Sequence, residues 1–129
     1  MVHESPPLGT IASLAASGTI ELGPIAIKNA RSVAVTIRGT THASATLPIR
    51  VKLRYSPNAK NYDTVDYCFF DLDLSAGNAT QETHLIDCPE TGYMSLLVNN
   101  TDTSFAATLI SVWVNVVRWP DELSSHDKV

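Results

Sequence analysis

Residues 32–40 read Ser-Val-Ala-Val-Thr-Ile-Arg-Gly-Thr, and this stretch decides the fold class. Val33, Val35 and Ile37 alternate with small or polar residues, so the three β-branched side chains fall on one face of an extended chain. A period of two that is rich in β-branched residues is typical of a half-buried β-strand. The sequence therefore predicts a strand here.

The same alternation recurs on both sides of this stretch. At 47–56 apolar residues directed inward alternate with three outward cations, which are Arg50, Lys52 and Arg54. At 66–74 the inward residues are expected to be Cys68, Phe70, Leu72 and Leu74, and the outward ones Asp71 and Asp73. We expect the cationic and anionic rows to pair across a hairpin. Shorter segments at 11–16, 19–22, 25–27, 81–87 and 93–99 also read as strands.

The last segment, 105–119, is apolar on both faces. A strand of this kind is central in its sheet, bent between two sheets, or covered by another subunit. Trp113 lies within it and is expected in the core. Regularly spaced short strands without a helical period predict an all-β fold, an antiparallel, jelly-roll-like β-sandwich of seven to eight strands. Its length of 129 residues suits a single domain over 1–129, with short irregular arms at 1–9 and 120–129.

Charge is unevenly distributed along the chain. The formal net charge is -4, which excludes a dedicated nucleic-acid binder, since such domains carry a basic surface. Residues 1–60 hold seven Lys and Arg and two Asp and Glu, whereas residues 61–129 hold two and eleven. Two interpretations stay open: faces of opposite sign that attract other copies or a partner, or strands from both halves that interleave and mix the charges.

The sequence contains no apolar run of the roughly 20 residues that a membrane span needs, so no membrane partner is expected. The first residues lack a basic region followed by an apolar one, and we expect no export signal. The expected location is a virion or another extracellular assembly reached without a signal peptide, with the cytoplasm as the alternative.

No motif for catalysis or for a cofactor is present. The four histidines, at positions 3, 42, 84 and 126, are scattered and none belongs to a nucleophile motif. We therefore expect a non-enzymatic protein without a cofactor. A small hydrolase is the remaining enzymatic hypothesis, and a histidine in a pocket beside an acid or a nucleophile would indicate it.

Cysteine and acidic residues give only general expectations. Cys68 and Cys88 are two buried thiols or a disulfide between neighbouring strands, and without a Cys-x-x-Cys spacing they do not indicate zinc. Asp63 and Asp66 flank a loop and are weak calcium candidates. No metal is expected as a resident group.

Residues 55–64, Tyr-Ser-Pro-Asn-Ala-Lys-Asn-Tyr-Asp-Thr, resemble a hairpin of the type Tyr-Ser-x-Asp-Gly-x-x-(Trp/Tyr)-Asp. This hairpin is found in discoidin-like sandwiches and in many small β-sandwich proteins of phage particles. Asn58-Ala59 stands here where the pattern has Asp-Gly. The phage resemblance implies a protein that decorates a shell by binding copies of itself and the shell.

The discoidin-like resemblance instead implies that end loops bind sugars or lipid headgroups. In this chain it points to residues 57–64 and to the turn at 89–92. Tyr62 is the best candidate for an exposed aromatic contact there, with Asn58 and Asp63 beside it.

The leading functional hypothesis is a structural or interaction protein that associates with itself, as a trimer for example, and with a capsid or other scaffold protein. Its interface candidates are Arg50, Lys52, Arg54, Trp113 and Trp119. The alternative is a carbohydrate-binding module that uses the end loops around 57–64.

Overall fold

The computed structural model describes residues 6–119 and contains eight β-strands. These are β1 (Gly9–Leu14), β2 (Thr19–Ala26), β3 (Ala30–Thr40), β4 (Ile49–Ser56), β5 (Cys68–Asp71), β6 (Ala79–Asp87), β7 (Tyr93–Asn100) and β8 (Ala107–Arg118). Of the predicted terminal arms, residues 1–5 and 120–129 lie outside the described part of the chain.

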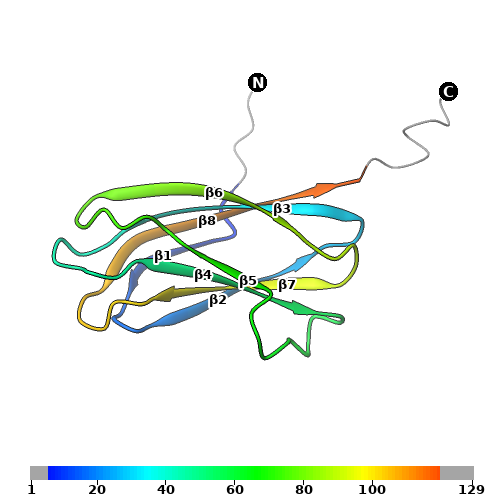
Figure 1. The fold of residues 1–129 in the computed structure, drawn as a ribbon, viewed down its shortest axis with the longest axis horizontal. Helices are drawn as coiled ribbons and strands as arrows, with labels where there is room; N and C mark the ends of the chain where they lie inside the picture. The colour runs from blue at the N-terminus through cyan, green and yellow to red at the C-terminus, as the bar shows by residue number, and fades with distance from the viewer. Residues whose placement is uncertain (1–5, 120–129) are drawn as a thin grey trace, which may run out of the picture.

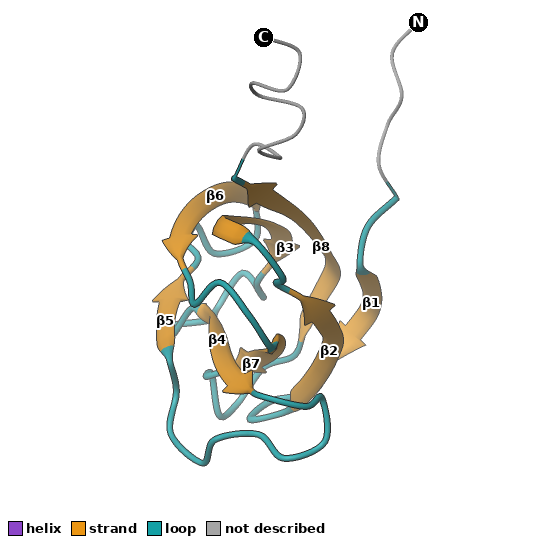
Figure 2. Ribbon diagram, turned by 90° about the vertical axis from the view of Figure 1, so that its right-hand side faces the viewer, coloured by secondary structure: helices purple, strands orange, loops and turns teal. Residues whose placement is uncertain are grey.

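The strands form two four-stranded antiparallel sheets that pack face to face (Figures 1 and 2). The strand orders are β1-β8-β3-β6 and β2-β7-β4-β5, so consecutive strands usually lie in different sheets or are not neighbours. This is the order of a jelly roll, in which Greek-key connections fold a long hairpin into two layers. The predicted all-β sandwich is confirmed, and the strand order, which the sequence left undetermined, is that of the jelly roll.

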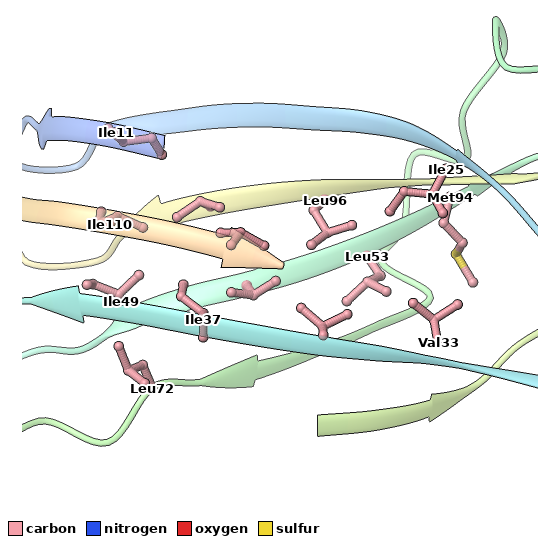
Figure 3. Close-up of a cluster of buried hydrophobic side chains, with 14 of the residues drawn as sticks. Ile11, Ile25, Val33, Ile37, Ile49, Leu53, Leu72, Met94, Leu96 and Ile110 are labelled. Atoms are coloured by element: carbon pink, nitrogen blue, oxygen red, sulfur yellow. The ribbon is translucent and has the colours of Figure 1, made fainter. Parts of the chain in front are cut away.

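The core lies between the sheets and follows from the alternation in the sequence. Val33, Val35 and Ile37 of β3 are fully buried and face Leu53 and Leu96 of the opposite sheet (Figure 3). Burying each such side chain contributes about 1.5–3 kcal/mol to folding. Because every strand has one buried face, a shift of one residue in its pairing would expose its apolar side chains.

β5 is shorter than the predicted strand at 66–74. It ends at Asp71, and Leu72 turns into the core, where it is 2% exposed and its N–H donates to the Ile49 carbonyl. The prediction that Leu74 faces inward is wrong. Leu74 follows this turn, and its side chain is exposed. Asp73 lies outside the strand too, and its backbone N–H donates to the Glu82 carboxylate.

β8 is central in its sheet, between β1 and β3. One of its faces packs in the core, and the other lies on the outer surface of the sandwich, where Leu109 and Val117 are exposed. Val112 and Val114 point into the core, so Trp113 lies on the outer face, half-buried and opposite Thr36 of β3. The prediction that Trp113 belongs to the core is therefore wrong: odd-numbered residues in this part of β8 face away from it.

The jelly-roll order mixes the two charge halves of the chain. Strands β1 to β4 come from the cationic half and β5 to β8 from the acidic half, and both sheets contain two of each. In both sheets each strand from the cationic half has only strands from the acidic half as neighbours. Of the two interpretations of the charge pattern, interleaving of the halves is the one that the structure supports.

β5 and β6 are edge strands of the two sheets and lie opposite each other on the same side of the sandwich. Side-chain contacts join them, and we call this contact region the β5–β6 seam. The ring of Phe70 in β5 stacks on His84 in β6, with centroids 3.9 Å apart. Tyr67 donates its hydroxyl to the Asp87 carbonyl at 2.9 Å. Cys68 and Cys88 are half-buried near this seam and are free thiols in the structure. Within residues 6–119 there is no helix of the length and apolar character that a membrane crossing requires.

Candidate ligand-binding face

The connection between β4 and β5, residues 57–67, is held in shape by its own side chains. The Asn58 carboxamide oxygen accepts the backbone N–H groups of Lys60 and Asn61, both at 2.9 Å. Ser56 lies at its base, and its hydroxyl accepts the Asn58 N–H at 3.2 Å. These local bonds fix the loop as an Asx-type turn, and they engage the side-chain oxygen of Asn58, one of the predicted ligand-binding residues, in holding the turn.

Tyr62 lies where this loop passes over the outer surface of β2-β7-β4-β5. Figure 2 shows the connection running beneath that sheet toward β2. The pKa of Tyr62 is raised mainly by burial, and the nearby Glu21 of β2 and Tyr93 of β7 raise it further. The loop therefore brings the predicted aromatic residue close to two strands that are distant in sequence.

A row of side chains crosses the sheet, and it begins at Glu21, the residue of β2 that lies near Tyr62. Pairing places Glu21 of β2 opposite Leu97 of β7, Leu97 opposite Lys52 of β4, and Lys52 opposite Phe69 of β5. Their sequence neighbours pack in the core, so these four side chains point outward. We call this row together with Tyr62 the loop face.

Phe69 is the most accessible aromatic ring of the loop face, with 54% of its surface exposed. The guanidinium carbon of Arg50 lies 4.4 Å from the ring centroid. Arg50 also donates twice to the Asp71 carboxylate, at 2.7 and 3.1 Å, and this contact raises the pKa of Arg50. One edge of the face is thus an aromatic ring flanked by a fixed ion pair.

The predicted cation row of β4 divides into paired and free members. Arg54 donates to Asp66 at 2.9 Å, so both outer arginines have acidic partners. Lys52, between them, forms no ion pair with any residue in 6–119. The central cation of the row is therefore available to a ligand.

The calcium candidates are not assembled into a site. Asp66 is bound to Arg54, and Asp63 is exposed, with its backbone N–H donating to the Tyr55 carbonyl. Across the described part of the chain, no three His, Cys, Asp or Glu side chains gather as a metal-binding group. Asp63 is close enough in sequence to Tyr62 to lie at the rim of the loop face.

Other predicted residues lie away from the loop face. Trp113 is on the outer surface of the opposite sheet, and Trp119 follows β8, with the Arg31 guanidinium 5.5 Å from its ring centroid. The turn at 89–92 does meet the end of β4, because the Tyr55 hydroxyl donates to the Thr91 carbonyl at 3.0 Å. The two end segments that the resemblance singles out therefore meet at one end of the sandwich.

Sequence reasoning missed Phe69 and Glu21 as members of the face. Phe69 shares the outward parity of Asp71, so the period-two pattern contained the signal for it. For Glu21 no local signal exists, because its place beside Tyr62 follows only from the pairing of β2 with β7.

One histidine does meet an acid, namely His84, whose Nε2 lies 3.0 Å from Glu82. His84 is stacked on Phe70, and the other oxygen of Glu82 accepts the Asp73 N–H. Both groups are thus engaged in closing the β5–β6 seam.

The fold has solved counterparts among carbohydrate-binding modules. A family 16 carbohydrate-binding module matches over 84% of this chain and 74% of its own length, with 14% identity and a TM-score of 0.53. The C-terminal family 6 module of LamC, a marine laminarinase from Zobellia galactanivorans, covers 83% and 92%, with 10% identity and a TM-score of 0.48.

A third counterpart is the pre-peptidase C-terminal domain of a collagenase from Bacillus anthracis, with 13% identity, coverage of 86% and 91%, and a TM-score of 0.45. No protein-family model matches the chain, and no curated protein is a detectable relative. At these identities the similarity shows the β-sandwich fold alone. None of the three counterparts is described as a phage protein, so the phage part of the resemblance has no support here.

Proposed function

We propose that the chain is a non-catalytic carbohydrate-binding module and that it binds sugar through the loop face. The observation that carries the proposal is Phe69, an aromatic ring 54% exposed on a sheet surface beside an unpaired lysine. The similarity in fold to a family 16 carbohydrate-binding module supports the class of ligand.

The chemistry of the face suits a pyranose ring. Such a ring has an apolar side of C–H groups, which packs on an aromatic ring, and an edge of hydroxyls that needs donors and acceptors. Phe69 offers aromatic surface with Lys52, its neighbour on β4, as a donor, and Tyr62 offers a second aromatic surface with Glu21 of β2 as an acceptor. Both roles are therefore filled by residues of one face.

The proposal is tested by affinity gel electrophoresis in laminarin, xylan and mannan, which are neutral polysaccharides. At least one of them should retard the protein. Phe69→Ala should weaken that binding about tenfold, because it removes the stacking surface while leaving a surface position otherwise intact. Tyr62→Ala should weaken it in the same gel.

Leu47→Ala is the matched control, since it removes an apolar side chain that is 44% exposed and lies before β4, at the opposite end of that strand from the 57–67 loop. Its migration should equal that of the wild type. Unretarded migration of the folded wild-type protein in all three polysaccharides would refute the proposal. Normal retardation of both Phe69→Ala and Tyr62→Ala would refute the assignment to the loop face.

Association with other copies is a second candidate function, and a different surface favours it. The outer face of β1-β8-β3-β6 carries Leu85 and Val117, which are 65% and 37% exposed, and the half-buried Trp113. Apolar side chains on one sheet face are typical of interfaces between subunits. This surface, rather than the mostly paired cations of β4, is where we place the interface.

Light scattering after size exclusion tests this second candidate. A homo-oligomer should be present at micromolar concentration, and Leu85→Glu should convert it to the monomer by placing a charge in the interface. A wild-type protein of 13.9 kDa at every concentration would contradict self-association.

A further inference from the structure

A bulge in β8 creates a second feature on the outer face of β1-β8-β3-β6. Arg38 of β3 pairs with Ser111 and Thr40 pairs with Thr108, so two residues of β8 stand opposite Gly39 alone. Ile110 uses the extra length to enter the core, at 1% exposure. Leu109 is directed outward, 70% exposed, with a φ of 53°.

The backbone of Leu109 is in the left-handed region, which is unfavourable for a residue with a side chain. Its leucine side chain gains no burial in return. Bulges and left-handed residues of this kind are concentrated at functional sites, where they direct a side chain to a place that a regular strand cannot reach.

Beside Leu109 the surface is hollowed. The hollow has a volume of about 400 Å³ and is lined by Thr10, Ile11, Ala12, Arg38, Leu109, Ile110 and Ser111. The hollow is an open depression rather than an enclosed cavity, and its volume lies near the lower end of the roughly 300–1,000 Å³ found for small-molecule sites. Leu109 and Ala12 supply apolar lining.

The polar part of the hollow is a row across three strands. Thr10 of β1 pairs with Ser111 of β8, and Ser111 pairs with Arg38 of β3. Arg38 is exposed, makes no ion pair with any residue in 6–119, and has the neutral Gln81 as its neighbour on β6. No acidic residue lines the hollow, so its net charge is positive.

We propose that this hollow binds a small ligand that carries a carboxylate, of the size of one uronic acid residue. The Arg38 guanidinium holds the carboxylate, since its fork of N–H donors matches two carboxylate oxygens. The Thr10 and Ser111 hydroxyls bond to the ligand's other polar groups, and Leu109 covers its apolar side. The site is distinct from the loop face and does not depend on it.

Isothermal titration calorimetry with D-galacturonate and D-galactose tests the proposal, because these sugars differ at the carboxylate. Galacturonate should bind and galactose should not. Arg38→Gln should weaken galacturonate binding about tenfold or more, as expected for loss of a charge-assisted bond. Arg31→Gln, an exposed cation of the same strand outside the hollow, is the matched control and should bind like the wild type.

Leu109→Gly is an independent variant that separates function from folding. Glycine adopts the left-handed backbone freely, so the melting temperature should rise, while galacturonate affinity should fall because the apolar wall is gone. Phe69→Ala should keep full galacturonate affinity, so that failure of the loop face and failure of the hollow are distinguishable.

Acetate and inorganic phosphate complete the experiment. Acetate should bind more weakly than galacturonate, because it lacks the groups that Thr10, Ser111 and Leu109 contact, and equal affinity would contradict a ligand of uronic-acid size. Equal affinity for galactose, tighter binding of phosphate, or unchanged affinity in Arg38→Gln would overturn the proposal.

Discussion

Ala59 has the backbone conformation that its turn requires. Its φ is 65°, in the left-handed region, and the Asn58 carboxamide beside it bonds to the two N–H groups that follow. The hairpin that this stretch resembles has Asp-Gly at these positions. The structure gives the physical reason, since the first residue must cap the turn and the second must accept a positive φ.

Ala59→Gly should therefore stabilise the protein by up to about 1 kcal/mol, because relief of the left-handed strain exceeds the added flexibility of the unfolded chain. Urea unfolding followed by circular dichroism measures the change. Gly replacement at the neighbouring Lys60 is the control and should not stabilise. A lower midpoint for Ala59→Gly would contradict the account of the turn.

Asp102 is the clearest pH-sensitive group at the other end of the sandwich. Its carboxylate accepts backbone N–H groups of Thr46, Ser104 and Phe105 at 3.0, 2.8 and 2.9 Å, and these bonds lower its pKa below the ordinary 3.8. A lowered pKa in the folded state stabilises the fold fully above the ordinary value, and the stabilisation is lost as the pH falls through the lowered one.

Asp102→Asn should accordingly be less stable than the wild type at pH 7 and should lose less stability between pH 5 and pH 2. Unfolding midpoints measured across this range test the prediction. Parallel curves for the two proteins would show that Asp102 does not carry the acid sensitivity.

Among the elements, the β4–β5 hairpin shows what alternation predicts and where it stops. The expected pairing of outer rows is confirmed for Arg50 with Asp71. Arg54 pairs with Asp66, which precedes β5, rather than with a residue of the expected anionic row. Asp73 does not belong to this row, because it lies beyond the end of β5. The cause is the inward turn at Leu72, whose burial outweighs one more exposed ion pair, which is worth at most about 1 kcal/mol.

The seam between β5 and β6 gives a prediction for the two thiols. Burial raises the pKa of Cys68, with Asp66 adding to it, and burial also raises the pKa of Cys88, with Asp87 adding to it. Less thiolate is then present at neutral pH, so alkylation by iodoacetamide at pH 7.5 should be slower than for a free cysteine peptide. Mass spectrometry of the intact protein counts the labels. Labelling as fast as the peptide would contradict the burial of both thiols.

At the scale of the whole molecule, the sandwich followed from the sequence and its topology did not. Alternation such as that of 32–40 is local and specifies one buried face per strand. The pairing of β1 with β8, or of β2 with β7, joins residues that are far apart in sequence, from Ala26 with Tyr93 to Gly9 with Val112, and leaves no local pattern. For the same reason the charge halves were visible but their interleaving was not.

The loop face, too, could be predicted from the sequence only in part. Tyr62 was identifiable from its loop, and Phe69 from its parity in β5. The proximity of Tyr62 to Glu21, and the row that leads from Glu21 across the sheet to Phe69, depend on the strand order. The hollow at Arg38 depends on a bulge that brings Leu109 outward, and a bulge cannot be read from alternating residues.

Chemical-shift mapping of ¹⁵N-labelled protein with oligosaccharides from laminarin, xylan and mannan tests the central claim most directly, because it locates the bound sugar. Binding at the loop face should give saturable shifts at Glu21, Lys52, residues 57–67, Phe69 and Leu97. Shifts confined to the outer face of β1-β8-β3-β6, or no shifts with any of these oligosaccharides, would contradict it.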